Sequence, residues 1–366
     1  MKTKDFNFEL PEELIAQHPP LHRGNSRLLV LQREKRSLEH RMVGELPAIL
    51  EKGTLMVFNN SRVRRARLIG LQEETEAKVE FLLLNNTDET KQVWRSMVQR
   101  AKRRRIGSRY LFTGRLSADG KIADNLIAEI VAEDGDFRII KFDKPIDDAW
   151  LDINGHVPLP PYIKRDDSKD DAERYQTVYA REYGSAAAPT AGLHFTNELL
   201  GELEKAGIET AFITLHVGLG TFLPVRSEEV EAHKMHDEAY NIDDETACRI
   251  EKAKSEGRKI LAVGTTSVRT LESAWLEDTS KPGCSELSCE HSGKLKRGEG
   301  TTSIFIYPGY IFKVVDMMFT NFHTPTSSLL MLVSAFVGRE FVLDAYKEAI
   351  REGYRFFSYG DACLIQ

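Results

Sequence analysis

The feature that most constrains the fold is a change of pattern inside the chain. Between Val63 and Phe142, apolar and polar residues alternate with a period of two in short segments, several of them separated by Asn-Asn, Gly or Asp-Gly turns. Regularly spaced short strands with such turns are typical of a small antiparallel barrel, and Asp134-Gly135 is a strong hairpin turn. We therefore predict an inserted antiparallel β-barrel domain over residues 63–149.

The rest of the chain alternates strands with helices. Thr196 can cap a helix, an apolar strand that ends at His216 follows it, and further strand and helix units come after them. Such alternation predicts a mainly parallel sheet covered by helices. Because the first sixty residues hold two apolar strands that can join this sheet, we predict an α/β main domain of residues 1–62 and 150–366 around the inserted barrel.

Length and composition fit this organisation. A chain of 366 residues exceeds what one hydrophobic core usually supports, and 41% hydrophobic residues are ordinary for a folded protein. Residues 277–300 are polar and rich in Gly, Pro and Ser, which predicts a mobile loop. We expect a cytoplasmic protein, because no targeting segment is visible, the longest apolar run (329–337) is too short for a bilayer, and the four cysteines are scattered.

Two loops combine histidines with glycines in a way that favours chemistry. Residues 185–238 hold four of the ten histidines: His194, His216, His233 and His236. The segments PTAGLHF and HVGLGTF place His194 and His216 beside glycines, which let a ligand approach the backbone closely. Histidine also titrates near neutrality and suits proton transfer. A lone histidine in a turn is usually only hydrogen-bonded, but two such loops in succession make that interpretation the weaker one.

A candidate anion site follows the predicted strand KILAVG. The residues GTTS and a helix come next, so backbone amides and hydroxyls meet at a helix N-terminus. The Walker lysine is missing, so this is not a P-loop. Thr265, Thr266 and Ser267, with Arg269 one turn inside the helix, could hold a carboxylate or phosphate. A well-capped turn without a ligand is equally compatible with the pattern.

Other polar residues suggest a pocket more than a metal site. His233, His236 and Glu238 resemble metal ligands, but the histidines are three apart where the zincin pattern needs four. We therefore predict no metal, and we expect His236 and Glu238 to line a polar pocket. Polar groups also lie at the ends of buried C-terminal elements, where function often sits: Asn321, His323, Tyr359 and Asp361. Asp361 could instead be a cap or a buried salt-bridge partner.

The predicted barrel carries two basic clusters, although the formal net charge of the chain is −6. The first cluster comprises Arg62, Arg64, Arg65 and Arg67. The second and denser one comprises Arg100, Lys102, Arg103, Arg104, Arg105 and Arg109. Lys and Arg groups of this kind contact phosphates and gain from counterion release. From charge alone, a nucleic-acid backbone site and a solvated loop are about equally compatible with the second cluster.

The chain resembles the S-adenosylmethionine:tRNA ribosyltransferase-isomerases of bacterial queuosine biosynthesis. The segments that match this family in order are PLPPYI, RYQTVYA, APTAGLHFT, TLHVGLGTF, GTTSVRTLES, IFIYPGY, TNFH and YRFFSYGDA, and the match runs essentially from end to end of the chain. The sequence departs from the family in FNNSRV, where an Asp-Thr pair is usual, at Thr324, where Leu is usual, and at Glu76-Ala77, where a glycine pair is usual. Asn60 removes a carboxylate that the family has at that point.

This resemblance implies that S-adenosylmethionine donates its ribosyl group. The group would be transferred and isomerised onto 7-aminomethyl-7-deazaguanine at the tRNA wobble position, giving epoxyqueuosine-tRNA, adenine and methionine. Such chemistry needs a base that removes a proton next to the sulfonium, help for the departing adenine, and a neutral amine. S-adenosylmethionine is then a co-substrate, and no cofactor is required. The implied partner is the anticodon stem-loop, and we expect a monomer and no membrane contact.

The resemblance also suggests roles for the candidate residues. His194 and His216 would transfer protons, with Asp361 or Glu238 orienting them or accepting protons. Thr265, Thr266, Ser267 and Arg269 would hold an anionic part of the donor, and Thr190 and Thr221 would contact its sugar. The remaining predicted substrate-binding residues are Gly192, His236, Asn321, His323 and Tyr359. A tRNA substrate favours the cluster Arg100 to Arg109 as the phosphate contact.

Two alternatives remain open. An S-adenosylmethionine-dependent RNA methyltransferase would release S-adenosylhomocysteine, and its expected glycine-rich first βα loop is absent from this sequence. A non-catalytic RNA-binding factor could use the barrel as its platform, but that function does not explain the two loops that combine histidine with glycine. Calorimetry with S-adenosylmethionine would separate the second alternative from both enzymes.

Overall fold

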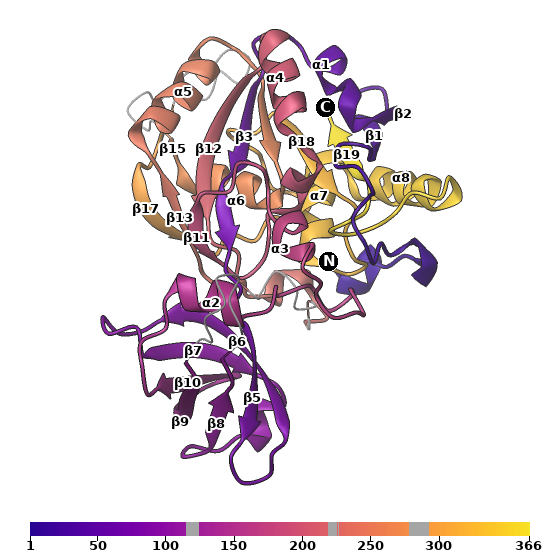
Figure 1. Cartoon of the computed structure of the whole chain (residues 1–366). Helices are drawn as coiled ribbons and strands as arrows, with labels where there is room; N and C mark the ends of the chain where they lie inside the picture. The colour runs from indigo at the N-terminus through magenta and orange to yellow at the C-terminus, as the bar shows by residue number, and fades with distance from the viewer. Residues whose placement is uncertain (115–123, 219–224, 226, 278–292) are drawn as a thin grey trace.

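The computed structural model covers the whole chain and describes all residues except 115–123, 219–224, 226 and 278–292. A large domain is built on a nine-stranded sheet, and a small barrel projects from it (Figure 1). The strands of the large sheet, in spatial order, are β17 (Gly298–Thr302), β13 (Glu238–Ile242), β12 (Glu209–Leu215), β3 (Leu55–Asn59), β14 (Ile260–Val263), β18 (Met317–Asn321), β19 (Ala362–Ile365), β1 (Arg27–Gln32) and β2 (Ser37–Met42).

The large sheet is mixed, so the prediction of a mainly parallel sheet is wrong. Among its eight neighbouring pairs, four are parallel: β12 with β3, β3 with β14, β14 with β18, and β19 with β1. The other four are antiparallel. One reason is local, because β1 and β2 are joined by a short turn and such connections force antiparallel pairing. At the opposite edge, β13 and β17 add two further antiparallel strands.

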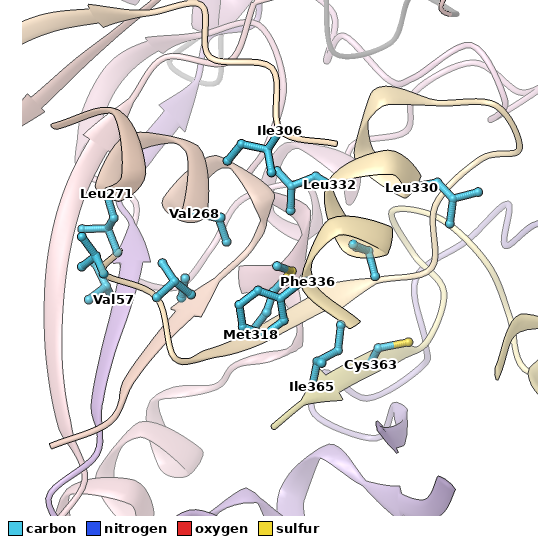
Figure 2. Close-up of a cluster of buried hydrophobic side chains, with 14 of the residues drawn as sticks. Val57, Val268, Leu271, Ile306, Met318, Leu330, Leu332, Phe336, Cys363 and Ile365 are labelled. Carbon is cyan, nitrogen blue, oxygen red and sulfur yellow. The ribbon is translucent and has the colours of Figure 1, made fainter. Parts of the chain in front are cut away.

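Helices cover both faces of the sheet, as the α/β prediction requires. One face carries α5 (Asp244–Ser255), α6 (Thr265–Ala274), α7 (Ser328–Val337) and α8 (Arg339–Arg351), and the other carries α1 (Leu46–Ile49) and α4 (Asn197–Lys205). Successive residues of β3 enter different cores: Val57 belongs to the same core as Val268 and Leu271 (Figure 2), whereas Phe58 belongs to the core on the other face. This double burial explains why the central strands are apolar throughout.

The predicted antiparallel barrel is confirmed. Its six strands close in the order β10 (Phe137–Phe142), β7 (Val93–Val98), β6 (Lys78–Asn86), β5 (Arg67–Gln72), β8 (Arg109–Phe112) and β9 (Leu126–Asp134). Gly135 has a φ of 57° in the turn between β9 and β10, as expected for the Asp-Gly hairpin. Inward-facing side chains such as Phe81, Tyr110 and Phe112 are buried inside the barrel, so its described residues form a packed core.

Short elements join the two domains. Strand β4 (Ser61–Val63) leads into the barrel and pairs with β11 (Glu182–Ser185), and α2 (Asp148–Asn154) leads out of it (Figure 1). Arg64 forms an ion pair with Asp148 at 2.5 Å, so the entering and leaving segments are tied together. The remaining short elements are η1 (Thr3–Phe6), η2 (Glu12–Leu14), η3 (Val43–Glu45), η4 (Ala101–Arg103), α3 (Asp171–Arg174), η5 (Thr190–His194) and η7 (Val230–Ala232).

The segment predicted as a loop over 277–300 differs from that prediction in its described part. Strand β15 (Trp275–Glu277) pairs with β16 (Gly293–Leu295), and β17 begins at Gly298. Residues 278–292 lie outside the described part of the chain. Within the described residues, no helix is both long enough and apolar enough to cross a membrane.

Candidate functional site

A cavity of about 430 Å³ lies at the C-terminal ends of parallel strands in the large sheet. Gly264 follows β14, Thr320 and Asn321 end β18, and Val217 follows β12 by two residues. Ligands of α/β proteins gather at this edge, and cavities that bind small molecules measure roughly 300–1,000 Å³. Its further lining residues are Pro161, Tyr162, Ala187, Ala188, Pro189, Thr190, Ala191, Thr265, Thr266, Phe322, His323, Thr324, Pro325, Ser327, Leu329, Phe357 and Ser358.

Five of the predicted substrate-binding residues line this cavity: Thr190, Thr265, Thr266, Asn321 and His323. The two adjacent threonines begin α6, so their hydroxyls and the free backbone amides of the first helical turn lie at the same wall. Gly264 precedes them with a φ of 88°, a conformation that favours glycine. The helix N-terminus predicted from GTTS is therefore present at the cavity, and anion binding there stays a prediction.

His194 lies behind the cavity wall and does not line it. Its side chain is 4% exposed, and both ring nitrogens form hydrogen bonds. The Asn321 amide donates to Nε2 at 3.0 Å, so the proton sits on Nδ1, which donates to the Ser26 hydroxyl at 2.8 Å. Burial, with the charges of Arg355 and Arg23, lowers the pKa of His194 to about 3. In this arrangement His194 orients Asn321, and no lone pair is left to accept a proton.

His216 also points away from the cavity. It follows β12 directly, whereas the next residue, Val217, lines the cavity, because successive residues of an extended segment face opposite ways. Its side chain lines a separate hollow of about 420 Å³ beside Tyr240. Burial lowers the pKa of His216, the nearby charge of Arg64 lowers it further, and Glu182 opposes these effects. The two predicted proton-transfer histidines are thus not brought together.

Glu238 and Arg269 form a buried ion pair between β13 and α6. The Glu238 carboxylate also accepts the Gly218 amide at 3.1 Å, and Arg269 Nε donates to the Ile304 carbonyl at 3.2 Å. Neither side chain lines the cavity. Each charge neutralises the other, and neither side chain is placed to contact a ligand in the cavity. The geometry therefore does not support the predicted roles of Glu238 in catalysis and of Arg269 in anion binding.

Two further predicted residues have bonding that fixes the backbone or the packing around the site. The Ser267 hydroxyl donates to the Val263 carbonyl at 2.8 Å and is fully buried. The Asp361 carboxylate accepts the amides of Arg27 and Arg355 at 2.9 and 2.8 Å, which matches the alternative role of a cap. Asp361 therefore holds the C-terminal strand in place and does not face the cavity.

Of the other predicted residues, those that the structure describes lie off the cavity as well. The Tyr359 hydroxyl donates to Asp171 at 2.7 Å in a buried cluster. Gly192 is required by packing, because a Cβ there would lie 2.1 Å from the Tyr179 hydroxyl oxygen. His236 is exposed to solvent, and Thr221 lies outside the described residues. Across the described segments, no three histidine, cysteine or acidic side chains converge as metal ligands do.

Aromatic and hydroxyl groups that we did not single out from the sequence complete the cavity. The Tyr162 hydroxyl lies 2.5 Å from the Ser358 hydroxyl, and its ring centroid is 4.6 Å from that of Phe357. Thr320 Oγ1 lies 2.9 Å from His323 Nε2. Burial raises the pKa of Tyr162 to about 12 and lowers the pKa of His323 to about 3. The tyrosine and the serine stand in PLPPYI and YRFFSYGDA, so the matching segments carried a signal for them.

The cavity lining is uncharged. Of its lining residues from the described part of the chain, only Tyr162 and His323 have titratable side chains. Their pKa values lie well above and well below neutrality, so both are neutral near neutral pH. Hydroxyls, amide groups, aromatic rings and a helix N-terminus are therefore the groups that a ligand meets there.

The two basic clusters lie at opposite ends of the barrel. Arg67 of the first cluster begins strand β5, on the side of the large domain, and Gln72 ends it. Gln72 pairs with Tyr110, the residue after Arg109 of the second cluster, so the second cluster lies at the barrel end remote from the large domain. Its exposed members are Arg100, Lys102, Arg103, Arg105 and Arg109. Arg109 lies 3.5 Å from Glu73, and Arg104 donates to Gln72 at 3.0 Å. The first cluster is nearer the large domain and is engaged there by acidic partners such as Asp148 and Glu80.

Comparison with known proteins agrees with this architecture along the whole chain. The family model described as queuosine biosynthesis protein matches residues 3–365. S-adenosylmethionine:tRNA ribosyltransferase-isomerases of Treponema denticola, Clostridioides difficile and Desulfitobacterium hafniense are 54%, 49% and 49% identical, over 100% of both chains in each case. A crystal structure of an S-adenosylmethionine tRNA ribosyltransferase from Thermotoga maritima has 34% identity and a TM-score of 0.52, covering 99% of this chain and 100% of its own. The chain therefore belongs to the queuosine biosynthesis protein family.

Proposed function

We propose that this chain is an S-adenosylmethionine:tRNA ribosyltransferase-isomerase. It transfers the ribosyl group of S-adenosylmethionine to 7-aminomethyl-7-deazaguanine at the tRNA wobble position and isomerises it, giving epoxyqueuosine-tRNA, adenine and methionine. The observation that carries this proposal is the identity of 49–54% to enzymes of that name over the full length of both chains. The matching family model supports the place of the reaction in queuosine biosynthesis.

The uncharged cavity suits S-adenosylmethionine as the small-molecule substrate. Tyr162 and Phe357 offer aromatic surface for the adenine ring, since such rings stack in offset or tilted arrangements. The methionine carboxylate would bind at the N-terminus of α6, where Thr265 and Thr266 add hydroxyls to the backbone amides. Thr190 is placed to contact the sugar. Arg269 supports this wall through its ion pair with Glu238 without touching the substrate.

The barrel would hold the anticodon stem-loop through its phosphates. The exposed second basic cluster, Arg100 to Arg109, carries the positive charge that such contacts need. The loop of the bound tRNA would then reach toward the large domain. We expect the enzyme to act as a cytoplasmic monomer.

Adenine release tests the proposed function directly. Purified protein is incubated with S-adenosylmethionine and tRNA that carries the precursor base, and the products are separated by chromatography. We expect adenine and methionine in equal amounts, and none with tRNA that carries unmodified guanine at the wobble position. S-adenosylhomocysteine in their place would identify a methyltransferase. Failure to bind S-adenosylmethionine in calorimetry would support a non-catalytic RNA-binding factor.

A further inference from the structure

The cavity offers very few groups that can accept a proton. Among the described residues that line it, none is a carboxylate, an amine or a thiol, and the titratable side chains are Tyr162 and His323. Tyr162 keeps its proton near neutral pH because burial raises its pKa to about 12. His194 and His216 do not line the cavity. His323 is therefore the one neutral imidazole that the described lining presents to a ligand.

Neighbouring groups hold His323 in a defined orientation. It stands two residues after β18, with a side chain that is 8% exposed, and its backbone amide donates to the Tyr346 hydroxyl at 3.0 Å. The ring is anchored by Nε2, which lies 2.9 Å from Thr320 Oγ1. Nδ1 has no hydrogen-bond partner within the described residues, and it is not among their enclosed polar atoms without a partner. Because His323 lines the cavity, Nδ1 is the ring nitrogen left for a ligand.

Burial keeps this imidazole neutral and makes its conjugate acid strong, although it also makes the ring a weaker base. The ring is unprotonated near neutral pH because burial lowers its pKa to about 3, so its lone pair is free. Once protonated, the buried imidazolium is a strong acid that readily gives its proton to a basic leaving group. The proposal requires the tautomer in which Nε2–H donates to the Thr320 hydroxyl, because this tautomer leaves the lone pair on Nδ1.

We propose, resting on the function proposed above, that His323 is the catalytic residue that accepts the proton from the carbon next to the sulfonium. The proton moves to Nδ1, the electron pair of the broken C–H bond stays on the carbon as a sulfonium ylide, and the ring becomes an imidazolium. Adenine later leaves with the electron pair of its glycosidic bond. It takes the proton from His323, so the ring ends neutral and adenine leaves as a neutral base.

The test compares His323→Gln with the wild-type protein and with His22→Gln, a matched change at an exposed histidine. We expect His323→Gln to lower kcat for adenine release by roughly 10²- to 10⁴-fold, the usual loss for a proton-transfer group. Its affinity for S-adenosylmethionine in calorimetry should stay within about threefold, because His323 acts mainly in the transition state. His22→Gln should behave as the wild type.

An isotope effect separates catalysis from a structural defect. With S-adenosylmethionine deuterated at the carbon next to the sulfonium, the primary isotope effect on kcat should increase in His323→Gln, because proton removal becomes the slow step. A misfolded fraction would lower kcat without changing that isotope effect. Turnover of His323→Gln within about threefold of the wild type, or an unchanged isotope effect, would overturn the assignment.

A second variant covers the case in which His323→Gln does not fold, as judged by circular dichroism. Thr320→Val keeps the shape of the side chain and removes the partner of Nε2. It should lower kcat about tenfold, the effect expected of one lost hydrogen bond, with little change in KM for S-adenosylmethionine. An unchanged kcat in Thr320→Val would overturn the proposal. Absence of adenine release by the wild type would instead refute the proposed function, whatever His323 does.

Discussion

Acidification should destabilise this protein through two buried neutral histidines. His194 and His323 are 4% and 8% exposed, and burial lowers the pKa of each from 6.5 to about 3. In the unfolded chain both rings bind a proton as the pH falls below 6.5, whereas in the folded chain they stay neutral. The unfolded state therefore binds more protons in this window. Stability is complete above the unfolded pKa and is lost progressively as the pH falls toward the folded pKa.

The size of the effect follows from proton linkage. Between about pH 7 and about pH 5, each ring should lower the free energy of unfolding by about 2 kcal/mol, and both together by about 4 kcal/mol. Burial lowers the pKa of His216 as well, so its contribution has the same sign. Because the total stability of a folded protein is commonly about 5–15 kcal/mol, this loss is large.

Urea unfolding followed by circular dichroism at the two pH values measures this loss. The variant His194→Gln removes one titrating ring, so its loss of unfolding free energy between the two pH values should be smaller than that of the wild type by about 2 kcal/mol. His22→Gln, at an exposed position, controls for the removal of a histidine. A wild-type loss below about 1 kcal/mol, or an equal loss in His194→Gln, would refute the reasoning.

Three substitutions test the structure around the cavity. Gly360→Ala should lower the free energy of unfolding by about 1–3 kcal/mol, because the new Cβ would lie 2.4 Å from a backbone oxygen. Gly44→Ala is the control, since a Cβ there has no atom within 4 Å, and it should leave the stability unchanged. Equal melting temperatures of the two variants would contradict this prediction. Glu238→Gln should lower the free energy of unfolding, measured in urea, by about 3–5 kcal/mol, because the charge of Arg269 stays buried without its counter-ion. A decrease below about 1 kcal/mol would contradict this prediction. Tyr162→Leu should raise KM for S-adenosylmethionine more than Tyr162→Phe, and the reverse order would exclude ring stacking.

The barrel could be predicted from the sequence because its signals are local. Period-two alternation and the Asp134-Gly135 turn depend only on neighbouring residues, and both appear in the structure. The edge strand β17 could not be predicted, because the segment GEGTT is polar and most of its side chains remain exposed. The direction of strands such as β13 and β19 depends on long connections, which the pattern of apolar residues does not encode.

The site was predictable in part for a similar reason. The hydroxyls of Thr265 and Thr266 follow a strand and begin a helix, so a short segment of sequence specifies their place. The bonding of His194 depends on Ser26, which is 168 residues away, and nothing in the local sequence announces it. For His216, the glycine-rich loop indicated access for a ligand but not the direction of the side chain. A shift of one residue along an extended segment changes the face that a side chain points to, so Val217 lines the cavity and His216 does not.

The separation between an uncharged cavity and a basic barrel end predicts two different responses to salt. If four exposed cations of the second cluster each contact a phosphate, tRNA affinity should fall roughly hundredfold between about 50 and 200 mM salt, because each contact releases counterions. KM for S-adenosylmethionine should change less than about twofold, since the described lining carries no charged side chain. Reversal of one charge by Arg103→Glu should reduce the salt slope for tRNA by about one unit and leave the response for S-adenosylmethionine unchanged. Equal salt dependence for the two substrates, measured in steady-state kinetics, would show that electrostatic attraction is not confined to the barrel.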